Sequence, residues 1–153
     1  MAKFTTTRLV AHAPDKMFDL VADIGRYSEF VPLCTALKVR RRAPGEGGTE
    51  VLTADMEVGY RAIREKFTSR VTLDRAAMRI NAAYIDGPFS HMDNRWSFEP
   101  EPGAPEKCRV VFYIDYAFKS RTFTVLMGGL FDAAFRRLSG AFEARADEIY
   151  GRG

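Results

Sequence analysis

Apolar and polar residues alternate with a period of two along most of the chain, which is the pattern of strands with one face in a core. The clearest example is CRVVFYIDYAFK, whose apolar face consists of Cys108, Val110, Phe112, Ile114, Tyr116 and Phe118. The same period predicts further strands over residues 3–11, 36–42, 49–58, 60–73, 77–85 and 91–99. Short turn sequences such as APGEGG and DGPF separate most of them, so we expect an antiparallel meander.

Two segments have a helical period instead. Pro14 suits a first helical turn, and Met17, Phe18, Val21 and Ile24 follow at helical spacing, so we expect a short helix over about residues 14–23 and a second short turn after it. Near the C-terminus one long helix is predicted by an aromatic stripe of Phe131, Phe135, Leu138, Phe142 and Ile149.

Gly128 and Gly129 lie near the start of this long helix. Each glycine costs a helix roughly 1 kcal/mol relative to alanine. We therefore expect a bend there, a close approach of another backbone, or a helix that begins after the two glycines.

The predicted order is one strand, two short helices, six strands and a long helix. A curved antiparallel sheet of about seven strands, wrapped around the C-terminal helix, buries all the apolar faces together. We therefore predict an α+β helix-grip fold that forms a single ligand-binding domain over residues 1–153.

Composition adds few constraints. The chain has 153 residues, of which 46% are hydrophobic, so it can bury a core without disulfides or metals. No segment approaches the roughly 20 apolar residues of a membrane span, and the N-terminal segment does not resemble a signal peptide. We expect a cytoplasmic protein whose membrane contact, if any, is peripheral at the inner face. Cys34 and Cys108 match no metal spacing and are expected to be buried thiols.

The segment YSEFVPLC, from Tyr27 to Cys34, is unusually apolar for a connection between elements. It is expected to lie at one end of the space between sheet and helix, either as the lid of a cavity or as a plug of a solid core. Its lid residues would be Tyr27, Phe30, Val31, Pro32 and Leu33. The walls of such a cavity would be Met56, Phe67, Trp96, Phe112, Ile114, Phe131 and Phe135.

Few polar residues fall on the inward faces. Glu65 shares its parity with Phe67, and a lone buried carboxylate is costly, so it is expected to form an ion pair, to turn outward at a bulge, or to lie at a wet mouth. Asn94 shares its parity with Trp96 and could hold a carbonyl oxygen. His12 and His91 form no metal or nucleophile motif and are expected at the surface.

Basic residues cluster in KVRRR, from Lys38 to Arg42, and at Arg136 and Arg137. Most such clusters are solvated faces. Together with an apolar loop, they suit an anionic membrane surface better than a nucleic acid, which needs exposed aromatic rings among the cations.

Several segments, taken in order, resemble the coenzyme Q-binding START-domain family of the polyketide cyclase/START-like superfamily. They are YSEFVPLC, DGPF leading into WSF, YIDYAFKS, and AFEARADEIY at the end of the long helix. The chain is also similar to the related bacterial ribosome-association toxin family. By position, the family's apolar loop, central hairpin and terminal helix match residues 30–32, 86–89 with Trp96, and Phe142, Arg145 and Tyr150.

The resemblance implies a helix-grip fold and a hydrophobic cavity that binds ubiquinone, without a covalent cofactor and without catalysis, in support of respiration and quinone biosynthesis. Phe67, Trp96 and Phe112 could then stack on the ring, and Glu65, Asn94 or Tyr116 could contact its oxygens. The partners would be ubiquinone or a related polyprenyl lipid, and a membrane or respiratory-chain enzymes.

Two other functions remain open at this point. The toxin family implies a protein that binds the large ribosomal subunit and blocks subunit joining, with KVRRR and the helix arginines on rRNA. A START-like cyclase or dehydratase would need acid–base groups inside the cavity, and by parity only Glu65 qualifies.

Overall fold

The structure, a computed structural model, describes residues 2–151. Its strands are β1 (Ala2–Val10), β2 (Cys34–Pro44), β3 (Glu50–Tyr60), β4 (Ile63–Asp74), β5 (Arg79–Asp86), β6 (Phe89–Glu101) and β7 (Ala104–Phe118). Its helices are α1 (Pro14–Ala22) and α2 (Arg121–Tyr150), with two short 3-10 helices, η1 (Ile24–Glu29) and η2 (Glu46–Gly48).

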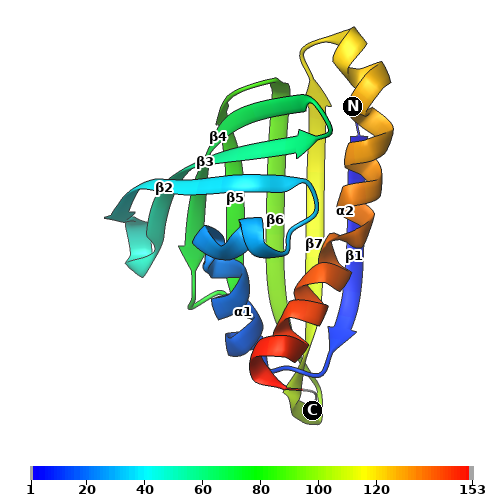
Figure 1. The fold of residues 1–153 in the computed structure, drawn as a ribbon. Coiled ribbons are helices and arrows are strands. Elements are labelled where there is room, and N and C mark those ends of the chain that lie inside the picture. The colour runs from blue at the N-terminus through cyan, green and yellow to red at the C-terminus, as the bar shows by residue number, and fades with distance from the viewer. Residues whose placement is uncertain (1, 152–153) are drawn as a thin grey trace.

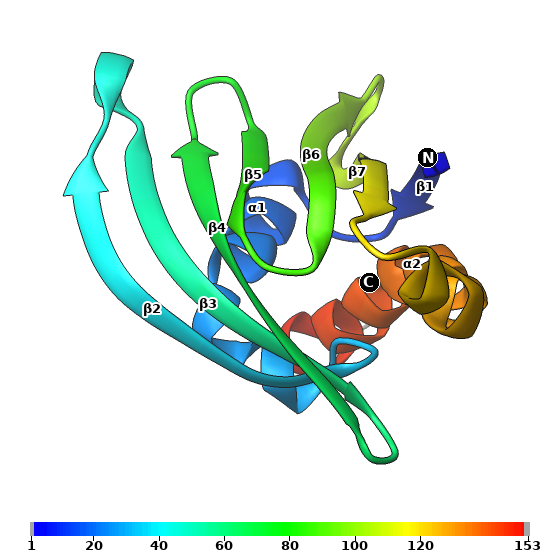
Figure 2. The ribbon, with the colours of Figure 1, turned by 90° about the horizontal axis from the view of Figure 1, so that it is seen from above.

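All seven strands form one antiparallel sheet in the order β1-β7-β6-β5-β4-β3-β2. The chain starts at one edge, crosses to the other edge through α1 and η1, and returns strand by strand (Figure 1). The sheet curves strongly, and α2 lies within the curve (Figure 2). The predicted α+β helix-grip fold is confirmed, including the two short helices after the first strand.

The core lies between the concave face of the sheet and α2. Alternate residues of β7 from Cys108 to Phe118 are buried, as their period of two predicts. Aromatic rings meet mostly edge to face, for example Trp96 and Phe142 at 5.0 Å between ring centroids. The two cysteines are free thiols and buried, as expected.

The last turn of α2 departs from the predicted stripe. Ile149 is 52% exposed, whereas Ala146 is fully buried and Tyr150 donates a hydrogen bond to the carbonyl of Lys16 at 3.1 Å. The helix passes the end of the sheet here and packs against the connection around α1, so its buried side rotates away from Ile149.

α2 begins before the two glycines, not after them. It starts at Arg121, and Ser120 caps it by accepting a hydrogen bond from the backbone N–H of Phe123 at 3.1 Å. A Cβ added at Gly129 would meet no atom within 4 Å, so no close backbone approach explains this residue either. Phe123 packs against Phe118 at 4.8 Å between ring centroids, and this contact stabilises the first turn despite the glycines.

The surface position predicted for His12 is wrong. Its side chain is buried, and its Nε2 lies 2.7 Å from Asp147 Oδ1, because the C-terminal end of α2 closes over the corner between β1 and α1. His91 is half-exposed, with its Nε2 3.0 Å from Asp115 Oδ1. Among the described residues, no helix is long and apolar enough to cross a bilayer.

Candidate functional site

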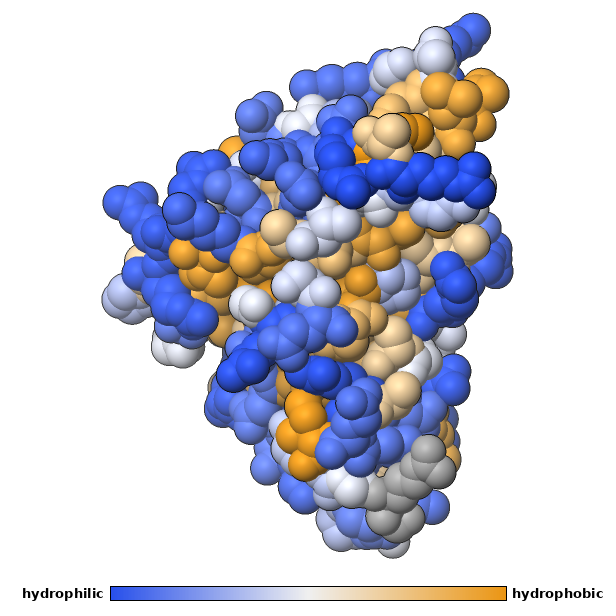
Figure 3. Space-filling model, viewed as in Figure 1, coloured by the Kyte–Doolittle hydropathy of each residue, from blue (hydrophilic) through white to orange (hydrophobic). Residues whose placement is uncertain are grey.

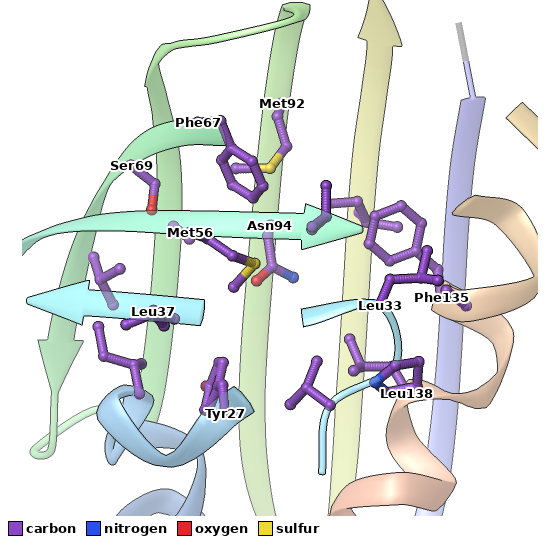
Figure 4. A pocket seen from close by; sticks show the side chains of 18 of the residues that line it. Tyr27, Leu33, Leu37, Met56, Phe67, Ser69, Met92, Asn94, Phe135 and Leu138 are labelled. Carbon is purple, nitrogen blue, oxygen red and sulfur yellow. The ribbon is translucent and has the colours of Figure 1, made fainter. Parts of the chain in front are cut away.

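A cavity of about 130 Å³ lies between the concave face of the sheet and α2 (Figure 4). Strands β2 to β7, the segment from η1 to β2, and α2 all contribute to its walls. The cavity lies here because the strongly curved sheet leaves a space between its own inward side chains and those of the helix.

Most of the residues predicted for the walls and the lid do line this cavity. They are Tyr27, Val31, Pro32, Leu33, Met56, Phe67, Asn94, Trp96, Phe112, Ile114, Phe131 and Phe135. Contact of these residues with a ligand stays a prediction.

Phe30, Glu65 and Tyr116 do not line the cavity. The Phe30 ring packs behind the lining, against the Phe142 ring, at 5.0 Å between ring centroids. Tyr116 is on the inward face of β7, but its ring packs against Phe135, which lies on the cavity wall, at 5.0 Å.

Glu65 lies opposite Val58 near the end of the β3–β4 hairpin, where it is half-buried. The pairing of these strands runs without a register shift, so no bulge turns the side chain outward. Within residues 2–151 no cation lies within salt-bridge distance of Glu65. Of the three placements considered for it, the ion pair and the bulge are not seen in the described part of the chain, and the wet mouth stays a prediction.

Three polar side chains face the cavity: Ser69, Asn94 and Tyr27. The Asn94 Nδ2 donates one of its two hydrogens to the carbonyl of Tyr113 at 3.0 Å, which leaves the second hydrogen and the amide oxygen for a ligand in the cavity. The Tyr27 hydroxyl is occupied, because it donates to the carbonyl of Val21, and burial raises its pKa far above the ordinary value.

Ser69 was not among the predicted residues, although its parity with Phe67 and Val71 was a signal that could have found it. Its hydroxyl lies on the cavity side of β4, and the Asn94 amide lies on the cavity side of β6 (Figure 4). One strand, β5, separates them, so their backbones are about 10 Å apart across the sheet. The cavity therefore offers neutral hydrogen-bonding groups at two separate points.

Leu33 lies at the rim of the cavity, and its backbone has a left-handed φ of 67°. Such a conformation costs a residue with a Cβ on the order of 1–2 kcal/mol. Its carbonyl accepts a hydrogen bond from Gly59 N at 2.9 Å, which ties the rim to the end of β3. In Figure 4, Leu33 lies on the side of the cavity formed by Phe135 and Leu138 of α2.

Arg145 connects η1 to α2. Its guanidinium lies 5.0 Å from the centre of the Phe30 ring and forms an ion pair with Glu29. This ion pair, together with Arg26, holds the pKa of the Glu29 carboxyl below its usual value. These contacts tie the end of η1 and Phe30 to α2.

The lining contains no His, Asp, Glu, Lys or Arg among the described residues. A wall of this kind binds neutral, mostly apolar groups, and its polar atoms can orient one or two carbonyl or hydroxyl groups. An engineered cavity of about 150 Å³ holds a benzene molecule, so this cavity has the size of one small ring.

Comparison with known proteins agrees with this geometry. A family described as polyketide cyclase / dehydrase and lipid transport matches residues 10–143. The ribosome association toxin RatA of Escherichia coli is 30% identical over 98% of this chain and 90% of its own. The coenzyme Q-binding protein COQ10 homolog B of Xenopus laevis is also 30% identical, and this chain spans 60% of its length.

Solved structures show the same fold. An 18 kDa protein of Caulobacter crescentus is 34% identical, with a TM-score of 0.78 and 99% of both chains covered. The Zhui aromatase/cyclase of a Streptomyces species has a TM-score of 0.73 at 19% identity, covering 95% of this chain and 93% of its own. The chain thus belongs to the polyketide cyclase / dehydrase and lipid transport family, within the START-like fold.

Proposed function

We propose that the protein binds ubiquinone or a related prenylated quinone and carries it without catalysing a reaction. The observation that supports this most is the cavity, which has the size of one ring and joins aromatic walls to neutral polar groups at two separate points. A benzoquinone is complementary to such a cavity, because it is a flat ring with a carbonyl oxygen at each end.

The ring contacts follow from the walls. Trp96 and Phe112 lie 4.8 Å apart between ring centroids and offer aromatic faces and edges to a bound ring. The Ser69 hydroxyl can donate to one carbonyl oxygen. At the other end, the second hydrogen of the Asn94 Nδ2, which the bond to Tyr113 leaves free, can donate to the other carbonyl oxygen.

The size of the cavity supports binding of the ring rather than of the prenyl tail. Drug-sized ligands occupy pockets of about 300–1,000 Å³, so a cavity of about 130 Å³ accepts the ring but no long tail. A buried CH₂ gains about 0.8 kcal/mol on leaving water, but almost nothing on leaving a bilayer. Transfer of the tail from the membrane to the protein therefore gains almost no free energy. The contacts with the ring determine how the quinone distributes between the bilayer and the protein.

The name of the COQ10 relative supports the quinone, and the names of the RatA relatives support ribosome binding as the second candidate. The charges favour the first. Two of the three consecutive arginines proposed to contact rRNA are paired with carboxylates: Arg40 with Asp55 at 2.6 Å and Arg42 with Glu50 at 3.4 Å. Paired cations gain less from phosphates, because the existing pair must first be broken.

Acid–base catalysis has weaker support. The one carboxylate considered for it, Glu65, lies outside the cavity lining, and the phenol of Tyr27 already donates to a backbone carbonyl. A cyclase or dehydratase needs groups that exchange protons beside the substrate.

Extraction of the purified protein tests the proposal. The protein, isolated from a quinone-producing host without detergent, is extracted with organic solvent, and the absorbance is recorded before and after borohydride. We expect a quinone spectrum that borohydride bleaches, in a substantial ratio to protein. Extracts without quinone, combined with salt-sensitive co-sedimentation with large ribosomal subunits, would favour the second candidate.

A further inference from the structure

We propose that one face of the protein docks onto an anionic lipid bilayer and places the cavity mouth against it. This mouth face consists of residues 57–66 at the β3–β4 hairpin and residues 119–131 at the start of α2. The inference rests on the proposed function, since it states how a quinone whose tail stays in the bilayer reaches the cavity.

The mouth face lies beside the opening of the cavity. Val58 and Phe131, at the inner ends of its two segments, line the cavity, and Gly59 is hydrogen-bonded to Leu33 of the rim. In Figure 1 the hairpin tip and the first turns of α2 both lie toward the upper right, whereas in Figure 2 the tip points downward and α2 begins above and to the right of it.

The apolar residues of this face are unusually exposed. Val125 is 83% exposed and Leu126 66%, the two highest values among the exposed large hydrophobic residues, and both lie in the second turn of α2. Tyr60 and Ile63 at the hairpin tip are 41% and 38% exposed. Figure 3 shows the hydrophobic atoms over the start of α2, with strongly hydrophilic atoms next to them. Aliphatic side chains beside cations suit the interface of a bilayer better than a nucleic acid.

The net charge of the chain is concentrated on the same face. The two segments contain five cations (Arg61, Arg64, Lys66, Lys119 and Arg121) and two carboxylates (Glu57 and Glu65). The net charge of the two segments is therefore +3, which equals the net charge of the whole chain. In the rest of the chain, positive and negative charges are equal in number. Each cation near an anionic leaflet contributes about 1 kcal/mol to binding.

These cations are not neutralised within the described part of the chain. No carboxylate there lies within salt-bridge distance of any of the five, whereas Arg95 and Arg109 elsewhere on the sheet are paired with Asp93 and Glu101. Arg64 donates to the carbonyls of Arg61 and Ile63, so it lies folded along the hairpin without a counter-charge.

Arg61 also occupies a position that favours glycine. Its φ is 57° at the tip of a two-residue hairpin loop, where a residue without a Cβ would avoid the strain. The hairpin therefore carries a cation at its tip at a conformational cost, which fits a function for the charge.

Vesicle flotation with the full chain tests the docking. Vesicles of phosphatidylcholine alone are compared with vesicles that also contain phosphatidylglycerol. We expect binding to the anionic vesicles only, and weaker binding at higher salt. The variant Val125→Asp/Leu126→Asp should bind at least tenfold more weakly, and Lys119→Gln/Arg121→Gln roughly thirtyfold more weakly.

The control variants change exposed residues elsewhere on the surface. Leu9→Asp introduces a carboxylate on β1, where Leu9 is 51% exposed, and Arg41→Gln/Arg70→Gln removes two exposed cations. Both controls should bind vesicles like the wild type. Equal losses in the controls, equal binding to both vesicle types, or no vesicle binding would overturn the docking.

Two further readouts exclude other occupants of the face. If Val125→Asp/Leu126→Asp dissociates a dimer in sedimentation equilibrium, or abolishes binding to ribosomal subunits while vesicles do not bind, the face has another partner and the docking is wrong. A short-tail ubiquinone analogue in solution, detected by the fluorescence of Trp96, separates the two proposals. Quinone binding without vesicle binding contradicts only the docking, and vesicle binding without quinone binding contradicts the proposed function.

Discussion

Ser69 and Asn94 determine the polarity of a cavity that is otherwise apolar. They face it from β4 and β6, while the neighbouring inward residues are apolar. A neutral hydroxyl and a neutral amide can remain in such a place without an ion partner, whereas a charged group could not.

At these two positions we predict a loss of quinone affinity with little loss of stability. Ser69→Ala should weaken binding of a short-tail quinone about fivefold, which corresponds to one hydrogen bond of about 1 kcal/mol. Asn94→Leu should weaken it similarly. The measurement is a quinone titration, with Ser97→Ala, half-buried on β6, as control. Unchanged affinity in both cavity variants would show that the carbonyl oxygens bind elsewhere.

Asp55 provides a residue-scale prediction that depends on pH. Hydrogen bonds from Arg40 and Thr68 lower its pKa from 3.8 to about 2. Because the folded pKa is below the unfolded one, this contribution to stability is complete above about pH 4 and is lost as the pH falls toward 2. Since the pair is partly exposed, its contribution is at most about 1 kcal/mol.

The variant Asp55→Asn should therefore lower the free energy of unfolding slightly at pH 7, and its stability should fall less steeply between pH 4 and 2. Urea denaturation at a series of pH values measures both. Glu106→Gln, an exposed position on β7, is the control. A variant whose stability falls as steeply as that of the wild type would contradict the role of Asp55.

At the scale of elements, periodicity was sufficient to predict the strands and their inward faces. It could not locate where α2 begins, because capping by Ser120 and the contact between Phe123 and Phe118 outweigh the cost of Gly128 and Gly129. It also failed where one element covers another. His12 looked exposed at the end of β1, and only the distant residue Asp147 explains its burial.

Gly129 gives a test of the helix. A methyl group at this position meets no atom within 4 Å, so Gly129→Ala should raise the free energy of unfolding by about 0.4–1 kcal/mol. Gly103→Ala is the contrasting control, because Gly103 has a φ of 78° in the β6–β7 turn and the change should be destabilising. A destabilised Gly129→Ala protein would mean that α2 is not continuous here.

The lid segment gives another prediction, since Cys34 follows it directly. Burial raises the pKa of the Cys34 thiol to about 11 and that of Cys108 to about 12, so both should react slowly with a thiol reagent at pH 8. Arg145→Gln removes the ion pair with Glu29 and the contact with Phe30, and should speed labelling of Cys34 about fivefold while Cys108 stays protected.

Arg137→Gln is the matched control on the exposed side of α2. Labelling is followed by mass spectrometry of the digested protein. If the two cysteines react at the same accelerated rate in Arg145→Gln, the variant has destabilised the whole fold. In that case Arg145 does not specifically hold the segment before Cys34 against α2.

At the scale of the whole molecule, the cavity is the feature that the sequence could suggest but not measure. Strand parity correctly brought Phe67, Trp96 and Phe112 to one wall. The volume depends on how far the curved sheet stands from α2, and parity contains no information on that distance. Parity placed Tyr116 on the inward face correctly, but it could not show that this ring packs against Phe135 and stays outside the cavity lining.

The same limit applies to the surface. The clusters in KVRRR and at Arg136 are visible in the sequence as runs of positive charge. In the structure, however, Arg40, Arg42 and Arg136 are paired with carboxylates. The unpaired cations of the mouth face are spread over two segments about 60 residues apart in the sequence, and only the fold brings them to one end of the molecule.

The most direct test of the account uses the single tryptophan of the chain, Trp96, which lines the cavity and is only 4% exposed. A short-tail ubiquinone analogue is titrated into the protein in solution, and the tryptophan fluorescence is recorded. The account predicts strong quenching that saturates at one quinone per chain, because a ring in the cavity contacts Trp96. Weak quenching that rises linearly without saturation, as collisions from solvent produce, would contradict it.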